Sequence, residues 1–164
     1  MEKVKALPDD IRWHAIGHLQ RNKASLVAPI SSLIHSVDSI RLYDALSKHA
    51  VEKLDVLIQV HIADEQNKHG FYPDDLKKIL DYGDNLLSPN MNIKGLMGMA
   101  TFTDNHAQIT TEFKALRTLF DEISPSMGLD FDTLSMGMSG DWKIAIDEGS
   151  TLIRVGSAIF GSRN

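Results

Sequence analysis

Short apolar runs alternate with amphipathic stretches along most of this chain. β-Branched and large apolar residues gather in six runs, and these predict strands over 13–19, 33–38, 54–62, 93–101, 132–138 and 151–156. Between the fourth and fifth runs, apolar residues recur at spacings of three and four, which predicts one face of a long helix: Ile109, Phe113, Leu116, Phe120 and Ile123.

Two further helices are predicted from their first residues. Pro73 precedes two acidic residues, and this order suits a first helical turn because proline needs no N–H partner there and acids favour the helix dipole. Asp38 and Ser39 offer a cap for a helix through Leu42 and Leu46.

Six strand–helix units in succession predict parallel strands joined by crossover helices in a single domain over residues 1–164. Two architectures fit, an open doubly wound sheet and a (β/α) barrel. In both, the carboxyl ends of the strands carry the functional site, and polar or glycine residues gather at these ends. A complete barrel has eight strands, so six units predict an incomplete one.

Composition narrows the class of protein. The chain is 43% hydrophobic and 24% charged, with a formal net charge of −5, which argues against a nucleic-acid or anionic-membrane surface. No run approaches the roughly 20 apolar residues of a membrane-spanning helix, and the first residues lack the apolar core of a signal peptide. The absence of cysteine excludes disulfides and thiolate sites. We therefore expect a soluble, cytoplasmic protein.

Two strand exits near the C-terminus carry anion-binding features. In "SMGMSGD" (135–141), glycines allow close backbone approach and N–H groups at a helix start favour an anion. The alternative is an ordinary turn capped by Ser139 or Asp141. Gly156 and Ser157 follow the last strand and precede a short predicted helix, so the two exits together suggest a phosphate cradle.

Arg154 lies in the apolar strand that leads to Gly156. A charge is rarely buried without a partner, because lost hydration is expensive. It is predicted to meet a phosphate, a buried carboxylate or the ring nitrogen of a heterocycle, and the structural alternative is an ion pair with an acid such as Asp38.

Four histidines and one lysine are further candidates for site residues. His14 and His18 are four apart, but on a strand this spacing spans roughly 13 Å, so we expect no metal site there. His35 and His61 are expected to be satisfied by neighbours. Lys68, in the loop 61–71, either reaches an anion or aldehyde or forms a surface salt bridge.

The motifs "WHAIGHLQRNK", "HSVDS", "LIQVHIADEQNKHGF", "GLMGMAT" and "LSMGMSGDWKIAIDEGSTLIRVGSAIFG" closely resemble the pyridoxal phosphate homeostasis protein (YggS/PROSC) family. The likeness runs in order from about residue 12 to residue 164. It implies an alanine-racemase-like (β/α) barrel, here with about six of its eight units. It also implies a pyridoxal 5′-phosphate carrier in vitamin B6 and amino-acid homeostasis that is not an enzyme.

The resemblance assigns roles to the same residues. It implies that Arg154 faces the pyridine nitrogen, where a cation disfavours protonation of the ring and weakens the cofactor as an electron sink. It implies a phosphate site formed by the N–H groups of Gly156 and Ser157, joined by Ser135 and Met136 or by Ser139.

One part of the family pattern has no counterpart here. In the family, the lysine that holds the cofactor aldehyde lies on the first strand, and this chain begins near the family's third strand. We therefore expect a shortened member with weakened, non-covalent binding. Lys68 is the only candidate for a substitute lysine, and the resemblance places it in a loop rather than at the cofactor aldehyde. The alternative is a ligand-free fragment or interaction module that self-associates through its open sheet edges, because unpaired edges favour association.

Overall fold

The computed structural model describes residues 2–64, 69–81 and 88–161. Its strands are β1 (His14–Ala15), β2 (Leu33–Val37), β3 (Leu54–Val60), β4 (Met91–Gly98), β5 (Thr133–Met138) and β6 (Leu152–Arg154). Its α-helices are α1 (Glu2–Ala6), α2 (Ala24–Val27), α3 (Ile40–His49), α4 (Pro73–Asp81), α5 (His106–Met127), α6 (Trp142–Asp147) and α7 (Ser157–Phe160). Two short 3₁₀ turns, η1 (Arg21–Lys23) and η2 (Ala28–Ile30), flank α2.

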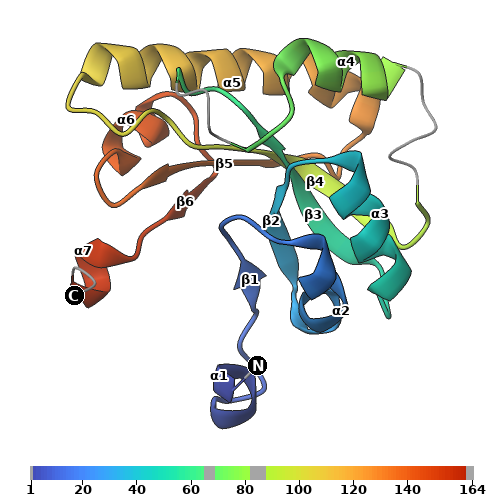
Figure 1. Cartoon of the computed structure of the whole chain (residues 1–164). Coiled ribbons are helices and arrows are strands. Elements are labelled where there is room, and N and C mark those ends of the chain that lie inside the picture. Colours follow the sequence, from blue (N-terminus) through green and yellow to red (C-terminus); the bar gives the residue numbers. More distant parts are fainter. Residues whose placement is uncertain (1, 65–68, 82–87, 162–164) are drawn as a thin grey trace.

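The six strands form one parallel sheet in the order of the sequence, β1 to β6. This order is that of a barrel wall and differs from that of a doubly wound sheet, in which the strand order reverses. In Figure 1 the long helix α5 runs with α4 along one side of the curved sheet, while α1 and α7 lie away from them. The prediction of an incomplete (β/α) barrel is confirmed.

The main core fills the space between the sheet and its helices. Alternate residues of the central strands point into it, as Val56, Ile58 and Val60 do from β3. All five apolar residues of the predicted helical stripe are buried on α5, so this prediction is confirmed. Ser39 caps α3 by accepting a hydrogen bond from the Leu42 N–H at 3.3 Å.

The opposite face of the sheet is the inner wall of the half-barrel. Leu33, Leu57 and Met97 form a small apolar cluster there. Leu57 alternates with the core residues of β3, which places this cluster on the inner wall. Buried polar residues also occupy positions in the central strands: His35, Gln59 and Ser135.

The first strand is much shorter than predicted. The run 13–19 reads as a strand, yet only His14 and Ala15 pair with β2. The chain then turns away at Gly17, whose φ of 86° lies in the left-handed region that glycine tolerates. The polar residues after Ala15 therefore lie in a loop at the carboxyl edge of the sheet.

No helix among the described residues is long and apolar enough to cross a membrane.

Candidate functional site

Arg154 lies at the end of β6 on the inner wall and is held by neutral oxygen atoms. Its Nη1 donates to the carbonyl oxygen of Ser135 at 2.9 Å and to the Ser135 hydroxyl at 2.7 Å. Its Nη2 donates to the carbonyl oxygen of Gly98 at 3.0 Å. The guanidinium therefore bridges β6, β5 and β4.

The environment of Arg154 keeps a positive charge inside the half-barrel. Burial lowers the pKa of Arg154 to about 10, and the carboxylate of Asp141 acts in the opposite direction. The side chain is still protonated at neutral pH. An ion pair with Asp38, the structural alternative from the sequence, does not form, because Asp38 pairs with His18 and His69.

A chain of hydrogen bonds leads from Arg154 to the first strand. The Ser135 hydroxyl lies 3.0 Å from Nδ1 of His35, and Nε2 of His35 lies 3.1 Å from Nδ1 of His14. Since Ser135 accepts from the guanidinium, its own hydrogen is available to His35 Nδ1, and His35 Nε2–H then donates to His14. With this direction, each N–H or O–H in the series of hydrogen bonds donates once.

His35 is neutral in this arrangement. Burial, then the positive charge of Arg154 and then the neighbouring His14 lower its pKa to about 3. The expectation that neighbours satisfy His35 is confirmed. Sequence reasoning missed that these neighbours connect it to Arg154, although strand alternation could have placed His35 on the inner wall.

The predicted phosphate cradle lies just beyond Arg154. The Ser139 hydroxyl oxygen accepts from the backbone N–H of Gly156 at 3.2 Å and from that of Ala158 at 3.3 Å. Two N–H donors thus converge on one oxygen atom at the start of α7. Gly156 and Ser157 are exposed, so an incoming anion could reach these donors.

The turn after β5 is shaped by Gly137 and Asp141. Gly137 has a φ of 95°, and a Cβ added there would lie 2.5 Å from the Cβ of Ala145 on α6. The Asp141 carboxylate accepts from the Met138 N–H and closes the turn. The structure thus uses Asp141 within the turn, while Ser139 reaches across to α7.

The remaining predicted residues fall in different places. Ser135 is fully buried, and its hydroxyl accepts from Arg154. Met136 is fully buried with its side chain in the main core, which leaves only its backbone to face the carboxyl edge. Lys68 lies outside the described residues.

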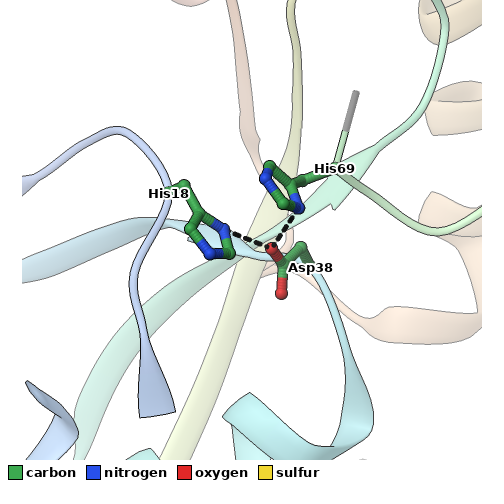
Figure 2. Close-up of side chains that lie close together, drawn as sticks. All are labelled: His18, Asp38 and His69. Atoms are coloured by element: carbon green, nitrogen blue, oxygen red, sulfur yellow. Dashed lines mark hydrogen bonds and ion pairs between the residues drawn. The ribbon is translucent and has the colours of Figure 1, made fainter. Parts of the chain in front are cut away.

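The two histidines considered as a metal pair are divided between two clusters. His14 bonds His35, whereas His18 bonds Asp38 at 3.1 Å. His69, in the loop after β3, approaches the same Asp38 oxygen at 3.7 Å. Figure 2 shows both rings turned toward this carboxylate.

The comparisons of this chain with known proteins agree on one family. Residues 5–164 match the family described as alanine racemase, N-terminal domain. The "Pyridoxal phosphate homeostasis protein" of Aquifex aeolicus is 38% identical over 167 residues, with 99% of this chain and 72% of that protein covered. The human protein of the same name is 34% identical, with 99% and 62% covered. The chain therefore spans about three fifths to three quarters of the length of such relatives.

Solved structures agree with these matches. PipY of Synechococcus elongatus PCC7942, determined with PLP bound, has a TM-score of 0.82 at 34% identity, covering 98% of this chain and 74% of PipY. Alanine racemase from Corynebacterium glutamicum has a TM-score of 0.72 at 14% identity, covering 99% of this chain and 45% of the racemase. The racemase likeness shows the fold alone.

Proposed function

The chain belongs to the pyridoxal phosphate homeostasis protein family, and from that premise we propose that it binds pyridoxal 5′-phosphate at the carboxyl ends of β5 and β6 without catalysing a reaction. The observation that carries this proposal is Arg154, a cation in the half-barrel held by two carbonyl oxygens and a hydroxyl. The role is one in vitamin B6 homeostasis, and the cysteine-free composition fits a cytoplasmic protein.

Arg154 has donors to spare for a ligand. A guanidinium carries five N–H groups, and three donate to described residues. The others would serve a ring nitrogen that accepts a hydrogen bond. Because the guanidinium is itself positive, it would hold that nitrogen unprotonated.

Gly156, Ser157 and Ser139 would hold the phosphate. The Ser139 hydroxyl oxygen already occupies the point where the Gly156 and Ala158 N–H groups converge, which shows that the turn accommodates an oxygen acceptor. A phosphate oxygen would take these donors and that of Ser157, with the Ser139 hydroxyl rotating to donate. Charge-assisted bonds of this kind are stronger than neutral ones.

Ser135 and Met136 would support the site without direct side-chain contact. The Ser135 hydroxyl fixes the guanidinium and joins it to His35. Met136 anchors β5 in the core. When bound, the cofactor supplies an aldehyde and an electron-accepting ring. A positive group at the ring nitrogen would make the ring a weaker electron acceptor, and this supports a carrier over an enzyme.

The test is ligand titration of the purified chain, followed by absorbance and fluorescence. Pyridoxine 5′-phosphate, which lacks the aldehyde, isolates non-covalent binding, and pyridoxal isolates the phosphate contribution. We expect the phosphorylated ligands to bind and Arg154→Gln to weaken their binding by roughly 10- to 100-fold, the value of a hydrogen bond to a charged group.

Arg117→Gln is the matched control, because Arg117 lies on α5 and pairs with Asp121 at 2.7 Å on the exposed surface. It should bind as the parent chain does. Equal affinity of Arg154→Gln and the parent, or equal affinity for pyridoxal and its phosphate, would contradict the proposal. Borohydride reduction and peptide mapping would reveal covalent attachment to Lys68, and turnover of an amino acid would overturn the non-catalytic role.

Self-association through the sheet edges is a second candidate function. Within the described chain β1 and β6 each pair with one strand only. Large apolar side chains near these edges are exposed, among them Ile16 (59%), Ile159 (69%) and Phe160 (87%). Light scattering over a range of concentrations tests this, and a compact monomer at all of them would refute it.

A further inference from the structure

Three side chains from three different strand exits meet at the carboxyl edge of the sheet, away from Arg154 along the strand order. His18 follows β1, Asp38 follows β2, and His69 lies in the segment after β3. One ligand atom from each, an imidazole nitrogen or a carboxylate oxygen, lies within 4.8 Å of the others. The proposed phosphate site needs none of these three residues.

The two imidazoles are arranged around a single oxygen atom. Nδ1 of His18 lies 3.1 Å and Nδ1 of His69 lies 3.7 Å from Oδ2 of Asp38. The rings are stacked, with centroids 3.7 Å apart and planes 13° from parallel, and Figure 2 shows one nitrogen of each ring directed to the carboxylate. The three donor atoms therefore come from three separate segments of the chain and lie close together.

The distances between these ligand atoms approach the ligand–ligand distances around a bound transition metal. With metal–nitrogen and metal–oxygen bonds of about 2.0 to 2.2 Å, the ligand atoms of a tetrahedral site lie about 3.4 Å apart. The two separations from Asp38 in the structure, 3.1 and 3.7 Å, fall on either side of that value. Coordination would need shifts of a few tenths of an ångström in these separations. It would also need one of the two stacked rings to rotate, because a metal ion lies in the plane of the imidazole that binds it, and the exposed side chain of His69 is free of the core in this respect.

The surrounding contacts hold this cluster in place. The side chain of Asp38 is 9% exposed, and its second oxygen accepts from the Ser39 hydroxyl at 3.2 Å. The carbonyl oxygen of His69 accepts from the buried amide of Gln59 at 2.8 Å. Such outer contacts orient ligands in metal sites.

The cluster is open on its outer side. The side chains of His18 and His69 are 44% and 53% exposed. Three protein ligands with an accessible outer face match sites that leave a coordination position to water or a small ligand, whereas closed structural zinc sites use four protein ligands.

The donor set selects a class of metal. Two imidazoles and one carboxylate suit zinc and its neighbours cobalt and nickel, whereas calcium and magnesium prefer oxygen ligands. The alternative is a cluster held by hydrogen bonds to Asp38 alone, and metal titration separates the two. A divalent cation instead binds both rings in their neutral form.

We propose that His18, Asp38 and His69 form a binding site for a divalent transition-metal ion of the zinc type, with at least one position open to solvent. The site is independent of the proposed cofactor function.

The experiment is metal titration of the untagged chain, stripped with chelator. Calorimetry with Zn²⁺ should give one site per chain, and Co²⁺ should give a visible d–d spectrum of low-coordinate cobalt. His69→Ala is the sharpest variant, because His69 is exposed and its fold contact is made by the backbone. It should abolish the Co²⁺ spectrum and lower the affinity by more than the roughly 10- to 100-fold cost of an outer-contact change.

Two further variants complete the design. Asp38→Asn keeps the size of the side chain and removes its charge, and it should weaken binding as His69→Ala does. His49→Ala removes an exposed histidine from the end of α3 and should bind Zn²⁺ like the parent chain. Thermal unfolding without metal checks that each variant folds.

The outcomes separate the proposal from its alternatives. Loss of binding in His69→Ala and Asp38→Asn, with His49→Ala unaffected, supports the site. No stoichiometric Zn²⁺ binding, an affinity unchanged in the first two variants, or equal binding of Mg²⁺ would overturn it. Loss of cofactor binding alone would leave the metal proposal intact.

Discussion

Replacing His35 by asparagine should change how the stability of the protein depends on pH. His35 is 1% exposed and bonded to Ser135 and His14. Its pKa falls from 6.5 to about 3, chiefly because burial disfavours the charged ring and secondly because Arg154 is close. Asparagine retains an acceptor near the position of Nδ1 and does not titrate.

The sign follows from proton linkage. In the unfolded chain His35 takes up a proton below pH 6.5, whereas in the folded chain it stays neutral until about pH 3. The unfolded state therefore binds more protons, so the contribution of His35 is complete above pH 6.5 and is lost as the pH falls toward 3. Each pH unit in that window costs about 1.4 kcal/mol, which makes the loss between pH 7 and pH 5 about 2 kcal/mol.

The assay is urea unfolding at pH 7 and pH 5 for the parent chain, His35→Asn and His49→Asn. Every other titrating group contributes nearly equally to the parent and to each variant, so the difference between proteins isolates one histidine. The parent chain should lose about 2 kcal/mol more than His35→Asn on acidification. His49→Asn, an exposed control, should follow the parent.

A parent and a His35→Asn variant with the same loss, within about 0.5 kcal/mol, would refute the reasoning. It would mean that His35 is charged in the folded protein at pH 5, and that the directed chain from Arg154 to His14 does not exist in solution. An equal loss of stability of the variant at both pH values would leave the predicted difference between pH 7 and pH 5 unaffected, because it reflects the cavity left by a smaller side chain.

Two further substitutions test the packing near the site. Gly137→Ala should destabilise the protein by about 1 to 3 kcal/mol in urea unfolding, since its Cβ meets Ala145 at 2.5 Å, while Gly140→Ala, with no atom within 4 Å, should be nearly neutral. Ser36→Ala should be neutral or stabilising by about 1 kcal/mol, because the buried Ser36 hydroxyl has no partner among the described residues; a clear loss of stability would show that it has one.

The sheet could be predicted from the sequence because local patterns carry it. All six strands appear near their predicted positions, and the helix of Ile109 and Phe113 extends over 106–127. The length of the first strand was overestimated, because its apolar residues have a single neighbouring strand and Gly17 turns the chain. Alternation of residue types does not report how many neighbours a strand has.

The site could be predicted only in outline. Parallel strands bring the exits after β5 and β6 together, so Ser139 and Gly156 were expected to be neighbours. The direction of each side chain was not accessible. The register between β5 and β6 shifts between Ser135 and Met138, and a shift of this kind cannot be read from the sequence. The three-residue cluster around Asp38 was missed because its members lie in separate loops, whereas sequence spacing compared His18 with His14.

Arg154 shows how one residue can serve both the fold and a ligand. A charge in an apolar strand predicts a partner without naming it, and the carboxylate expected at Asp38 proved to be occupied by two histidines. Carbonyl and hydroxyl oxygens satisfy three N–H groups but cannot cancel a unit charge. Burial, and after it this residual charge, lowers the pKa of His35 and keeps the ring neutral. In the proposed function, this cation would also favour the phosphate at Gly156, so Arg154→Gln should affect both the inner wall and ligand binding.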